Sequence, residues 1–247
     1  MNFTNKNVLI AGGTTGIGLT TAKEFIKAGA NVWITGRNNA NLEKAATEIG
    51  SSQLKTIVAD TANLSDLTLL EKTFTEGNTK IDVLYLNAGI AKFASIEEVT
   101  EADFDAQFNT NVKGHFFTLQ KLIPHLAEGS SVIFTSSTVA TATNLGTSIY
   151  SSTKGALNII AQIAANELIG RKIRVNIVSP GPITTPGLEG VIPEEARQHL
   201  AAATAMQRIG DASEVAKAVL FLASDDASFI TGTELVVDGG YLNYALK

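Results

Sequence analysis

Tyr150 and Lys154 are the residues whose types and spacing point most directly to chemistry. They stand four positions apart in a helical pattern over residues 149–160, and a helix places residues at that spacing on one face. An ammonium beside a phenol stabilises the phenolate and lowers the phenol pKa, which suits the phenol for proton transfer. On a solvent-exposed face the same two side chains would be an ordinary surface pair.

A glycine-rich stretch, AGGTTGIG at residues 11–18, follows a short apolar run and opens a helical pattern. Between a strand and a helix, glycines allow a tight turn and let a pyrophosphate approach the helix N-terminus, whose free N–H groups favour negative charge. This placement favours a dinucleotide site over a turn without a ligand. The spacing is one residue longer than the general dinucleotide fingerprint.

The choice between NADH and NADPH is expected to depend on residues about 20 positions after the glycines. No carboxylate occurs from residue 25 to residue 42, and the second apolar run ends in Thr35-Gly36-Arg37. A carboxylate there would bind the ribose 2′-hydroxyl of NAD, whereas the guanidinium of Arg37 suits a 2′-phosphate. We therefore expect NADPH/NADP in preference to NADH/NAD, with a solvated turn arginine as the alternative.

Composition excludes several classes of function. The 247 residues carry a formal charge of −5 and no run of basic residues, so nucleic acid is not an expected partner. The chain has no cysteine, and its three histidines show no metal-ligand spacing, so no disulfide and no metal site is expected. The N-terminal apolar run is too short for a signal peptide or a membrane span, so we expect a cytoplasmic protein with no membrane partner.

Apolar, β-branched runs alternate with longer helical patterns, which is typical of strand–helix–strand units around a parallel sheet. We expect a single α/β domain over residues 1–247, a Rossmann-type doubly wound sheet of about seven parallel strands with helices on both faces. The expected strands are residues 7–11, 30–35, 54–59, 81–86, 131–136, 174–178 and 234–237. The expected helices begin near Gly16, Asn39, Ser65, Glu101, Ser148, Pro193 and Ala212, the last capped by Asp211 or Ser213.

Residues 7–240 resemble the short-chain dehydrogenases/reductases, because a series of motifs follows the order of that family. The motifs are the glycine loop, Leu86-Asn87-Ala88-Gly89, Asn111-Val112-Lys113-Gly114, Thr135-Ser136-Ser137, Tyr150-Ser151-Ser152-Thr153-Lys154 and Ser179-Pro180-Gly181-Pro182-Ile183-Thr184-Thr185. One such motif is a weak signal, whereas the ordered series is highly specific.

The resemblance implies a catalytic set of Asn111, Ser137, Tyr150 and Lys154, with Ser137 preferred to Ser136 for its distance from the tyrosine along the chain. Ketone reduction needs a hydride from the nicotinamide and a proton for the developing alkoxide, and the phenol is the expected proton donor. Ser137 is expected to stabilise the carbonyl oxygen by a hydrogen bond. By the same resemblance Lys154 binds the nicotinamide ribose, and Asn111 holds a water that links Lys154 to solvent.

The resemblance also implies further cofactor contacts. Asp60 is expected to meet the adenine ring, Asn87 and Gly89 the adenosine side, and Ile183 and Thr185 the nicotinamide amide. The whole set of expected cofactor-binding residues is Gly12, Thr14, Thr15, Gly16, Ile17, Gly18, Arg37, Asp60, Asn87, Ala88, Gly89, Tyr150, Lys154, Pro180, Gly181, Ile183 and Thr185.

The substrate pocket is expected around Val139, Leu145, Ile149 and Leu188, under a lid formed by residues 182–205. Because these side chains are apolar, we expect a small-molecule ketone or aldehyde that is itself apolar. One alternative is a 3-oxoacyl-acyl-carrier-protein reductase of fatty-acid synthesis, for which Arg171, Lys172 and Arg174 are candidates for a basic docking patch. A second alternative is an NADPH-binding regulator without turnover, which the intact catalytic set disfavours.

The resemblance further implies a homotetramer. The apolar residues Phe116, Phe117, Ile163 and Ile169 are expected to pack either inside one subunit or between two. His115, four residues after Asn111, is expected to pack within a helix or an interface rather than to act as an additional acid.

Overall fold

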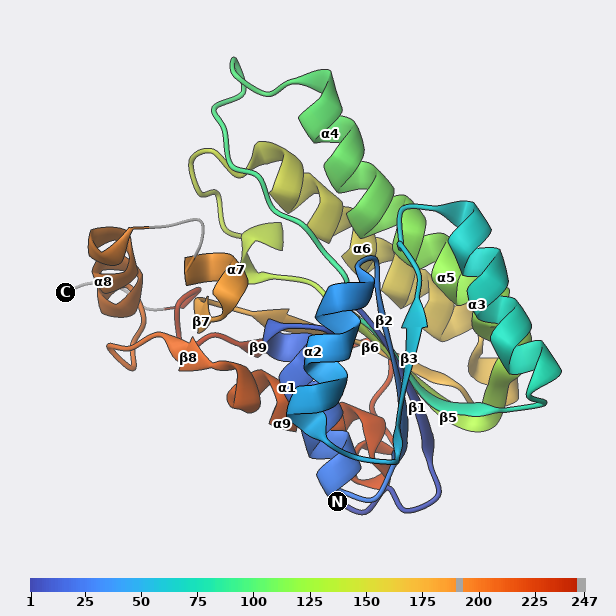
Figure 1. Cartoon of the computed structure of the whole chain (residues 1–247). Helices are drawn as coiled ribbons and strands as arrows, with labels where there is room; N and C mark the ends of the chain where they lie inside the picture. The colour runs from blue at the N-terminus through green and yellow to red at the C-terminus, as the bar shows by residue number, and fades with distance from the viewer. Residues whose placement is uncertain (190–192, 244–247) are drawn as a thin grey trace.

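Seven parallel strands form the centre of the molecule in a computed structural model that describes residues 1–189 and 193–243 (Figure 1). The strands are β1 (Asn7–Ala11), β2 (Asn31–Gly36), β3 (Leu54–Val58), β4 (Ile81–Leu86), β5 (Leu126–Thr135), β6 (Arg174–Pro180) and β9 (Glu234–Val237). Their order across the sheet is β3-β2-β1-β4-β5-β6-β9, and every neighbouring pair is parallel. The expected doubly wound α/β sheet is confirmed.

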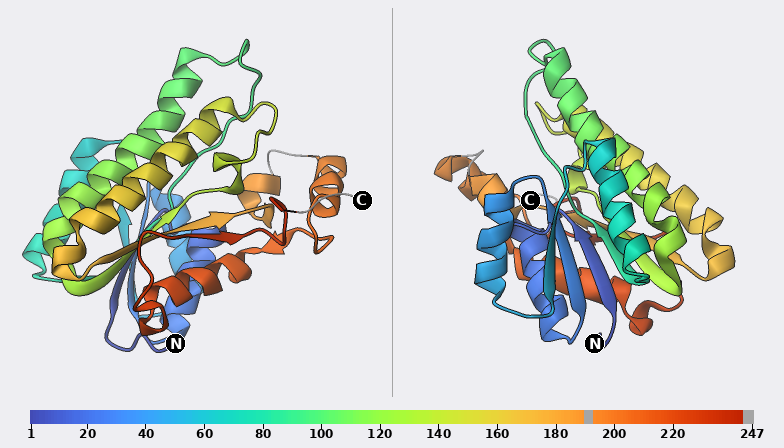
Figure 2. Two further views of the ribbon diagram at one scale, coloured as in Figure 1. Left: turned by 180° about the vertical axis from the view of Figure 1, so that it is seen from behind. Right: turned by 45° about the vertical axis from the view of Figure 1, so that its right-hand side comes forward.

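Helices cover both faces of the sheet (Figure 2). One face carries α1 (Gly16–Lys27), α2 (Asn39–Ile49) and α9 (Ala212–Ala223), and the other carries α3 (Leu64–Glu76), α4 (Glu101–Phe108), α5 (His115–Leu122) and α6 (Ser148–Glu167). Successive side chains of a strand point to opposite faces, so Leu9 joins the core under α3, α5 and α6, while Ile10 joins the core under α1 and α9. Burial on both faces explains why the strands read as continuous apolar runs.

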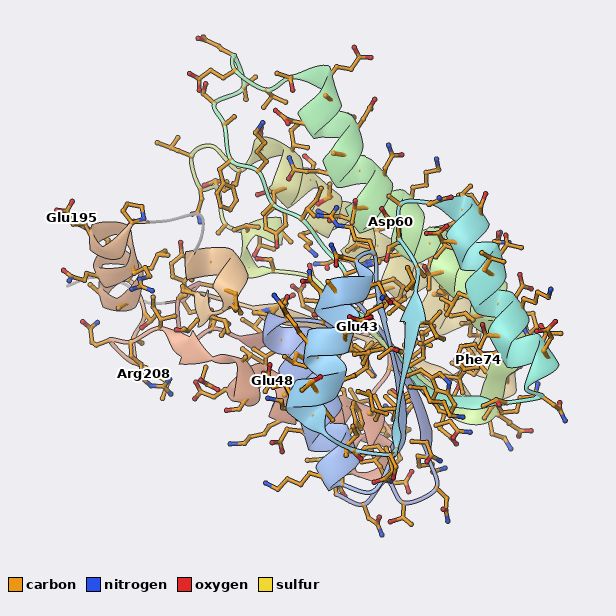
Figure 3. The ribbon with its side chains drawn as sticks, viewed as in Figure 1. Glu43, Glu48, Asp60, Phe74, Glu195 and Arg208 are labelled. Atoms are coloured by element: carbon orange, nitrogen blue, oxygen red, sulfur yellow. The ribbon has the colours of Figure 1, made fainter. Side chains whose placement is uncertain are left out.

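The direction of the chain reverses at β1, which determines where a ligand can bind. From β1 the chain proceeds outward through β2 and β3, and it then returns to β4 on the other side of β1. In such sheets the loops after the neighbouring strands diverge and leave a crevice at the carboxyl edge. Figure 3 places Asp60 just beyond β3 at this edge, above Glu43 and Glu48 of α2.

Most element boundaries lie where the sequence predicts them. The strands at residues 7–11, 81–86 and 234–237 and the starts of α1, α2, α4, α6 and α9 agree with the expectation. At the start of α9 the cap is Asp211, whose carboxylate accepts from the Ser213 N–H at 2.8 Å and whose own N–H donates to Glu214. The largest strand difference is β5, which begins at Leu126 rather than at residue 131, because Leu126 already pairs with Ile81 across a register shift.

The expected lid, residues 182–205, contains the helix predicted near Pro193 and two short elements that the sequence does not predict. The predicted helix is α8 (Glu194–Ala202), with Pro193 at its N-cap. The other two are β7 (Ile183–Thr184), which pairs in parallel with β8 (Gly210–Asp211), and the helix α7 (Pro186–Glu189). Helix α8 stands away from the sheet in both views of Figure 2. Residues 190–192 of the expected lid lie outside the described residues.

A π-helical segment, Asn109–Gly114, joins α4 to α5, where the sequence predicts an ordinary helix. Its last residue, Gly114, lies so close to the loop after β3 that a Cβ there would overlap the carbonyl of Thr61. The side-chain amide of Asn111 is fully buried and exchanges two hydrogen bonds of 2.9 Å with the backbone of Ile90. Packing at these two points accounts for the wider turn, a feature found frequently at functional sites.

Candidate active site

The glycine-rich loop packs directly against the end of β4. Gly12 has φ +82°, a conformation that favours glycine, and a Cβ there would lie 2.6 Å from the Cα of Ala88. A Cβ at Gly18 would overlap the carbonyl of Gly12, so helix α1 approaches the loop as closely as the backbone permits. The side chain of Thr15, at the N-cap of α1, makes no capping hydrogen bond in the described structure. The first N–H groups of α1 therefore remain available to an anion in the loop.

A cleft of about 280 Å³ opens beside this loop at the carboxyl ends of β1 to β4. Several expected cofactor residues line it together, namely Gly12, Thr14, Thr15, Arg37, Asp60, Asn87, Ala88 and Gly89. A second cleft of about 420 Å³ includes Thr14, Thr15 and Gly16 and extends to Thr184 and Pro186. A Cβ at Gly16 would meet the Thr185 side chain at 3.3 Å, so the segment after β6 lies against the glycine loop. The glycine loop, the free N–H groups and the first cleft fit a dinucleotide, and the second cleft shares Thr14, Thr15 and Asn41 with the first.

The rim of the first cleft carries one acidic and one basic residue. A carboxylate oxygen of Asp60 accepts from the Ala62 N–H at 2.9 Å, which orders the turn after β3. Arg37 is exposed, and its guanidinium forms no salt bridge with any described residue. A cation on the rim with no carboxylate partner is what recognition of a phosphate requires.

Sequence reasoning missed part of this lining. The additional residues are Thr35, Gly36, Asn38, Asn41, Ala59, Thr61, Ile90 and Thr110. Most of them belong to the ends of β2, β3 and β4 or directly follow them, so their position at strand ends was the available signal. Thr110 lies in the π-helical segment and had no such signal.

The four expected catalytic residues come together from three elements. Lys154 and Tyr150 lie on α6, Ser137 follows β5, and Asn111 lies in the π-helical segment. The ammonium of Lys154 lies 5.6 Å from the centre of the Tyr150 ring, and the hydroxyl of Ser137 lies close enough to the phenol to affect its pKa. Ser136 is turned away, since its buried hydroxyl contacts the carbonyl of Lys154 at 3.4 Å.

Gly89 connects the catalytic residues to the cofactor cleft. A Cβ at Gly89 would lie 3.5 Å from Oδ1 of Asn111 and 3.7 Å from Nζ of Lys154. The amide of Asn111 also donates to the hydroxyl of Thr153 at 3.1 Å, which joins the π-helical segment to α6 next to Lys154. Lys154 donates to the carbonyl of Thr135 at 2.8 Å.

The environment of the site shifts the pKa values of its two titratable residues. Burial raises the pKa of Tyr150 to about 12, and Ser137 opposes this effect. Burial also lowers the pKa of Lys154 to about 8. The expected lowering of the phenol pKa by Lys154 stays a prediction, and the net shift of the phenol is upward because loss of solvation is the largest effect on it. At neutral pH the phenol keeps its proton, which is the form that a proton donor needs.

The expected substrate residues differ in exposure. Val139, Ile149 and Leu188 are partly buried, whereas Leu145 is fully exposed on the loop before α6. Phe93 contacts Tyr150 edge to face, with ring centres 6.0 Å apart. The two loops that carry Phe93 and Leu145 are joined by a 3.0 Å hydrogen bond from Ala94 N–H to the carbonyl of Gly146. An aromatic side chain therefore packs beside the Tyr150 ring, and the assignment of the other residues to a substrate pocket stays a prediction.

His115 is fully buried beside Phe134, at the start of α5. Neither ring nitrogen has a hydrogen-bond partner of normal geometry among the described residues, although the backbone of Ala88 lies near enough to affect the ring. Burial, and secondarily the charge of Lys154, lowers the pKa of His115 to about 3. The expectation of a packing histidine agrees with this burial, because a ring that stays neutral cannot donate as an acid at neutral pH.

Replacing His115 by leucine should remove part of the pH dependence of folding. Below pH 6.5 the unfolded chain protonates this histidine while the folded chain does not, so the free energy of unfolding falls as the pH falls. The expected loss is about 2 kcal/mol between pH 7.5 and pH 5 in the wild type, and near zero in His115→Leu. Denaturant unfolding at both pH values measures it. His199 is exposed, so His199→Gln is the control and should show the wild-type change of unfolding free energy with pH. The same change in the wild type and in His115→Leu would contradict the assignment of this pH dependence to His115.

Comparison with known proteins agrees with this geometry. A family model described as enoyl-(acyl carrier protein) reductase matches residues 11–242. The chain belongs to the short-chain dehydrogenase/reductase family of oxidoreductases.

Two curated relatives and one solved structure illustrate the similarity. The chain is 34% identical to a 3-oxoacyl-acyl-carrier-protein reductase of Thermotoga maritima, covering 97% of this chain and 99% of the relative. It is also 34% identical to an NADP-dependent (R)-specific alcohol dehydrogenase of Lentilactobacillus kefiri, covering 96% of both. A short-chain dehydrogenase from Burkholderia cenocepacia, solved in complex with NADP, superposes with a TM-score of 0.91 at 31% identity, covering 98% of this chain and 99% of that chain.

Among the described residues, no helix combines the length and the apolar character needed to span a membrane. The same residues contain no group of three or more histidine and acidic side chains arranged to hold a metal ion.

Proposed function

We propose that this protein is an NADPH-dependent carbonyl reductase, which transfers a hydride between the nicotinamide and a ketone or aldehyde with Tyr150 as the acid and base. The observation that carries the proposal is the phenol of Tyr150, with Ser137 close enough to affect its pKa and the Lys154 ammonium 5.6 Å from its ring, near a glycine-lined cleft. Bound NADPH would supply the hydride. Tyr150 then holds the proton for the alkoxide, and Ser137 holds the substrate oxygen.

NADPH, rather than NADH, is proposed because of Arg37. The glycine loop, Asp60, Asn87 and Gly89 would hold the adenosine and pyrophosphate, and Arg37 at the rim would pair with the 2′-phosphate. The NADP named for the Burkholderia cenocepacia structure and for the Lentilactobacillus kefiri relative supports this assignment. Lys154 and the segment with Ile183 and Thr185 would bind the nicotinamide half of the cofactor.

An apolar small molecule is the proposed substrate class. Phe93 packs beside the Tyr150 ring, the proposed pocket residues Leu145 and Ile149 are apolar, and the polar side chains assigned to the carbonyl are Ser137 and Tyr150. Such a lining favours aryl or alkyl ketones and aldehydes over charged substrates.

The carrier-protein alternative rests on the Thermotoga maritima relative and needs a basic surface. The three candidate residues are already engaged. Lys172 forms a 2.7 Å salt bridge with Glu128, Arg171 donates to the carbonyls of Ile123 and Leu126, and Arg174 donates to the carbonyls of Leu222 and Ser224. Because these three side chains already have partners within the chain, the carrier-protein reductase is the second candidate function.

A substrate panel tests the proposal. Purified protein and NADPH are mixed with an aryl ketone, a diketone, a 3-oxo ester, a steroid ketone or an acetoacetyl thioester, and loss of NADPH absorbance is followed. Turnover of the simple ketones supports the carbonyl reductase. Turnover confined to the thioester favours the carrier-protein candidate, and NADPH binding without turnover of any compound favours a regulator.

A homotetramer is the proposed assembly. Phe116 on α5, Ile163 on α6 and Ile169 in the 3₁₀ turn after α6 are between 43% and 53% exposed, which leaves apolar surface there, whereas Phe117 packs on the core. Covering this surface by other copies of the chain would remove it from water. Light scattering should give a mass near four times 26.0 kDa. Phe116→Glu with Ile163→Glu should lower that mass, and a monomeric wild type would contradict the proposal.

A further inference from the structure

A set of hydrogen bonds joins the glycine loop to β4 and β5. The hydroxyl of Thr135, on β5, donates to the hydroxyl of Tyr85, on β4, at 2.8 Å, and both hydroxyls lie 3.1 Å from Oδ1 of Asn87. On its other side, Nδ2 of Asn87 donates to the carbonyl of Gly12 at 2.8 Å. Tyr85 is fully buried and Thr135 is 8% exposed, so the bond between their hydroxyls is shielded from water, whereas Asn87 is partly buried and lines the cleft.

The carbonyl of Gly12 and the two hydroxyls together determine which way the Asn87 amide faces. The carbonyl can only accept, so it requires the NH₂ group of Asn87 on its side. Each hydroxyl has one proton: with the Thr135 proton on the Tyr85 oxygen, Tyr85 donates to Oδ1 of Asn87, and the Thr135 hydroxyl, also 3.1 Å from Oδ1, can donate there when Tyr85 does not. The reverse orientation would place two oxygens against each other at the glycine loop and leave one hydroxyl proton of the pair without an acceptor, which is costly.

The same set reaches the catalytic lysine through one residue. The hydroxyl of Thr135 donates to Tyr85 and lies 3.1 Å from Oδ1 of Asn87, while its backbone carbonyl accepts from Nζ of Lys154 at 2.8 Å. Burial raises the pKa of the Tyr85 phenol, which therefore remains a neutral donor at all working pH values. Tyr85 and Thr135 stand in apolar strands and touch neither the expected substrate nor the reacting atoms.

We propose that Tyr85 and Thr135 are positioning residues that fix the Asn87 amide and through it hold the glycine loop in its cofactor-binding shape, with Thr135 also holding Lys154. The proposal rests on the proposed NADPH-dependent function. Its consequence is redundancy, because either hydroxyl alone suffices to keep the oxygen of Asn87 pointing inward.

The test is the dissociation constant for NADPH of Tyr85→Phe, Thr135→Val and the double variant, measured by cofactor fluorescence. Each single change removes one hydroxyl at nearly constant shape and should weaken binding by less than about threefold. The double variant should weaken it by about thirtyfold, more than the product of the single effects. Tyr85→Phe combined with Thr135→Ser restores one donor and should bind within about threefold of Tyr85→Phe alone.

Ser131→Ala is the matched control, because it removes a buried hydroxyl bond of β5 to the carbonyl of Leu222, away from the cleft. It should leave NADPH binding unchanged. A double variant that binds NADPH like wild type overturns the inference alone, whereas a wild type that does not bind NADPH overturns the proposed function. If the double variant does not fold, NMR of the two single variants provides the test, by the rate at which the side-chain amide protons of Asn87 exchange with solvent. Exchange faster than in the wild type in both single variants supports the inference. Exchange at the wild-type rate overturns it.

Discussion

Tyr150→Phe should lower kcat for ketone reduction by about 10²- to 10⁴-fold while leaving the affinity for NADPH within about threefold of wild type. The change removes only the phenolic oxygen, so the edge-to-face contact with Phe93 and the packing of α6 are retained. Because the pKa of Tyr150 is raised to about 12, the wild-type phenol is protonated throughout the neutral range and serves as the proton donor there. Single-turnover reduction of the best ketone from the panel measures the loss.

Tyr241→Phe is the matched control for this variant. It removes a phenolic oxygen that accepts from the Asn144 amide at 3.0 Å and takes no part in the catalytic set. It should reduce ketones at close to the wild-type rate. A Tyr150→Phe variant as fast as wild type would show that the proton comes from another group and would overturn the assigned chemistry.

Arg37→Leu should lower kcat/KM for NADPH by about 10- to 100-fold and change the value for NADH by less than about threefold. A charge-assisted hydrogen bond to the 2′-phosphate exists only with NADPH, so its loss affects one cofactor and spares the other. The ratio of the two kcat/KM values at constant substrate measures the change. Lys72→Leu removes a positive charge from the exposed face of α3 and should leave that ratio unchanged.

Creating an NADH-preferring variant requires more than Gly36→Asp with Arg37→Leu. A Cβ at Gly36 would lie only 2.5 Å from Cγ2 of Thr14, so an aspartate there needs the threonine methyl group to move or be removed. Adding Thr14→Ser provides that space and keeps the hydroxyl. An unchanged preference for NADPH in the triple variant, and in Arg37→Leu alone, would contradict the role given to Arg37.

The sequence predicts the sheet because its strands are buried on both faces and therefore appear as apolar runs between helical patterns. Residues such as Arg37 and Asp60 were also predictable, since they follow strands whose carboxyl ends share one edge. Their place in the cleft agrees with the expectation, whereas their roles stay predictions.

Other features depend on tertiary contacts and leave no local signal. The π-helical turn arises from the contacts of Gly114 with Thr61 and of Asn111 with Ile90, across residues distant in the chain. The direction of the Tyr150 pKa shift depends on how much protein surrounds the phenol. Tyr85 and Thr135 read as strand residues, and only the structure shows that their hydroxyls meet at Asn87.

The π-helical turn amounts to one extra residue inserted into an otherwise continuous helix from α4 to α5. Forcing ordinary helical geometry on all of Asn109–Gly114 would rotate α5 by about 100° and carry its apolar stripe away from the sheet. Deleting the exposed Lys113 would instead leave both helices in phase and remove the π-helical turn that places Asn111. The packing of α4 and α5 on the sheet and the position of the Asn111 amide thus depend on different residues. A descendant protein could therefore lose the position of Asn111 and keep the fold.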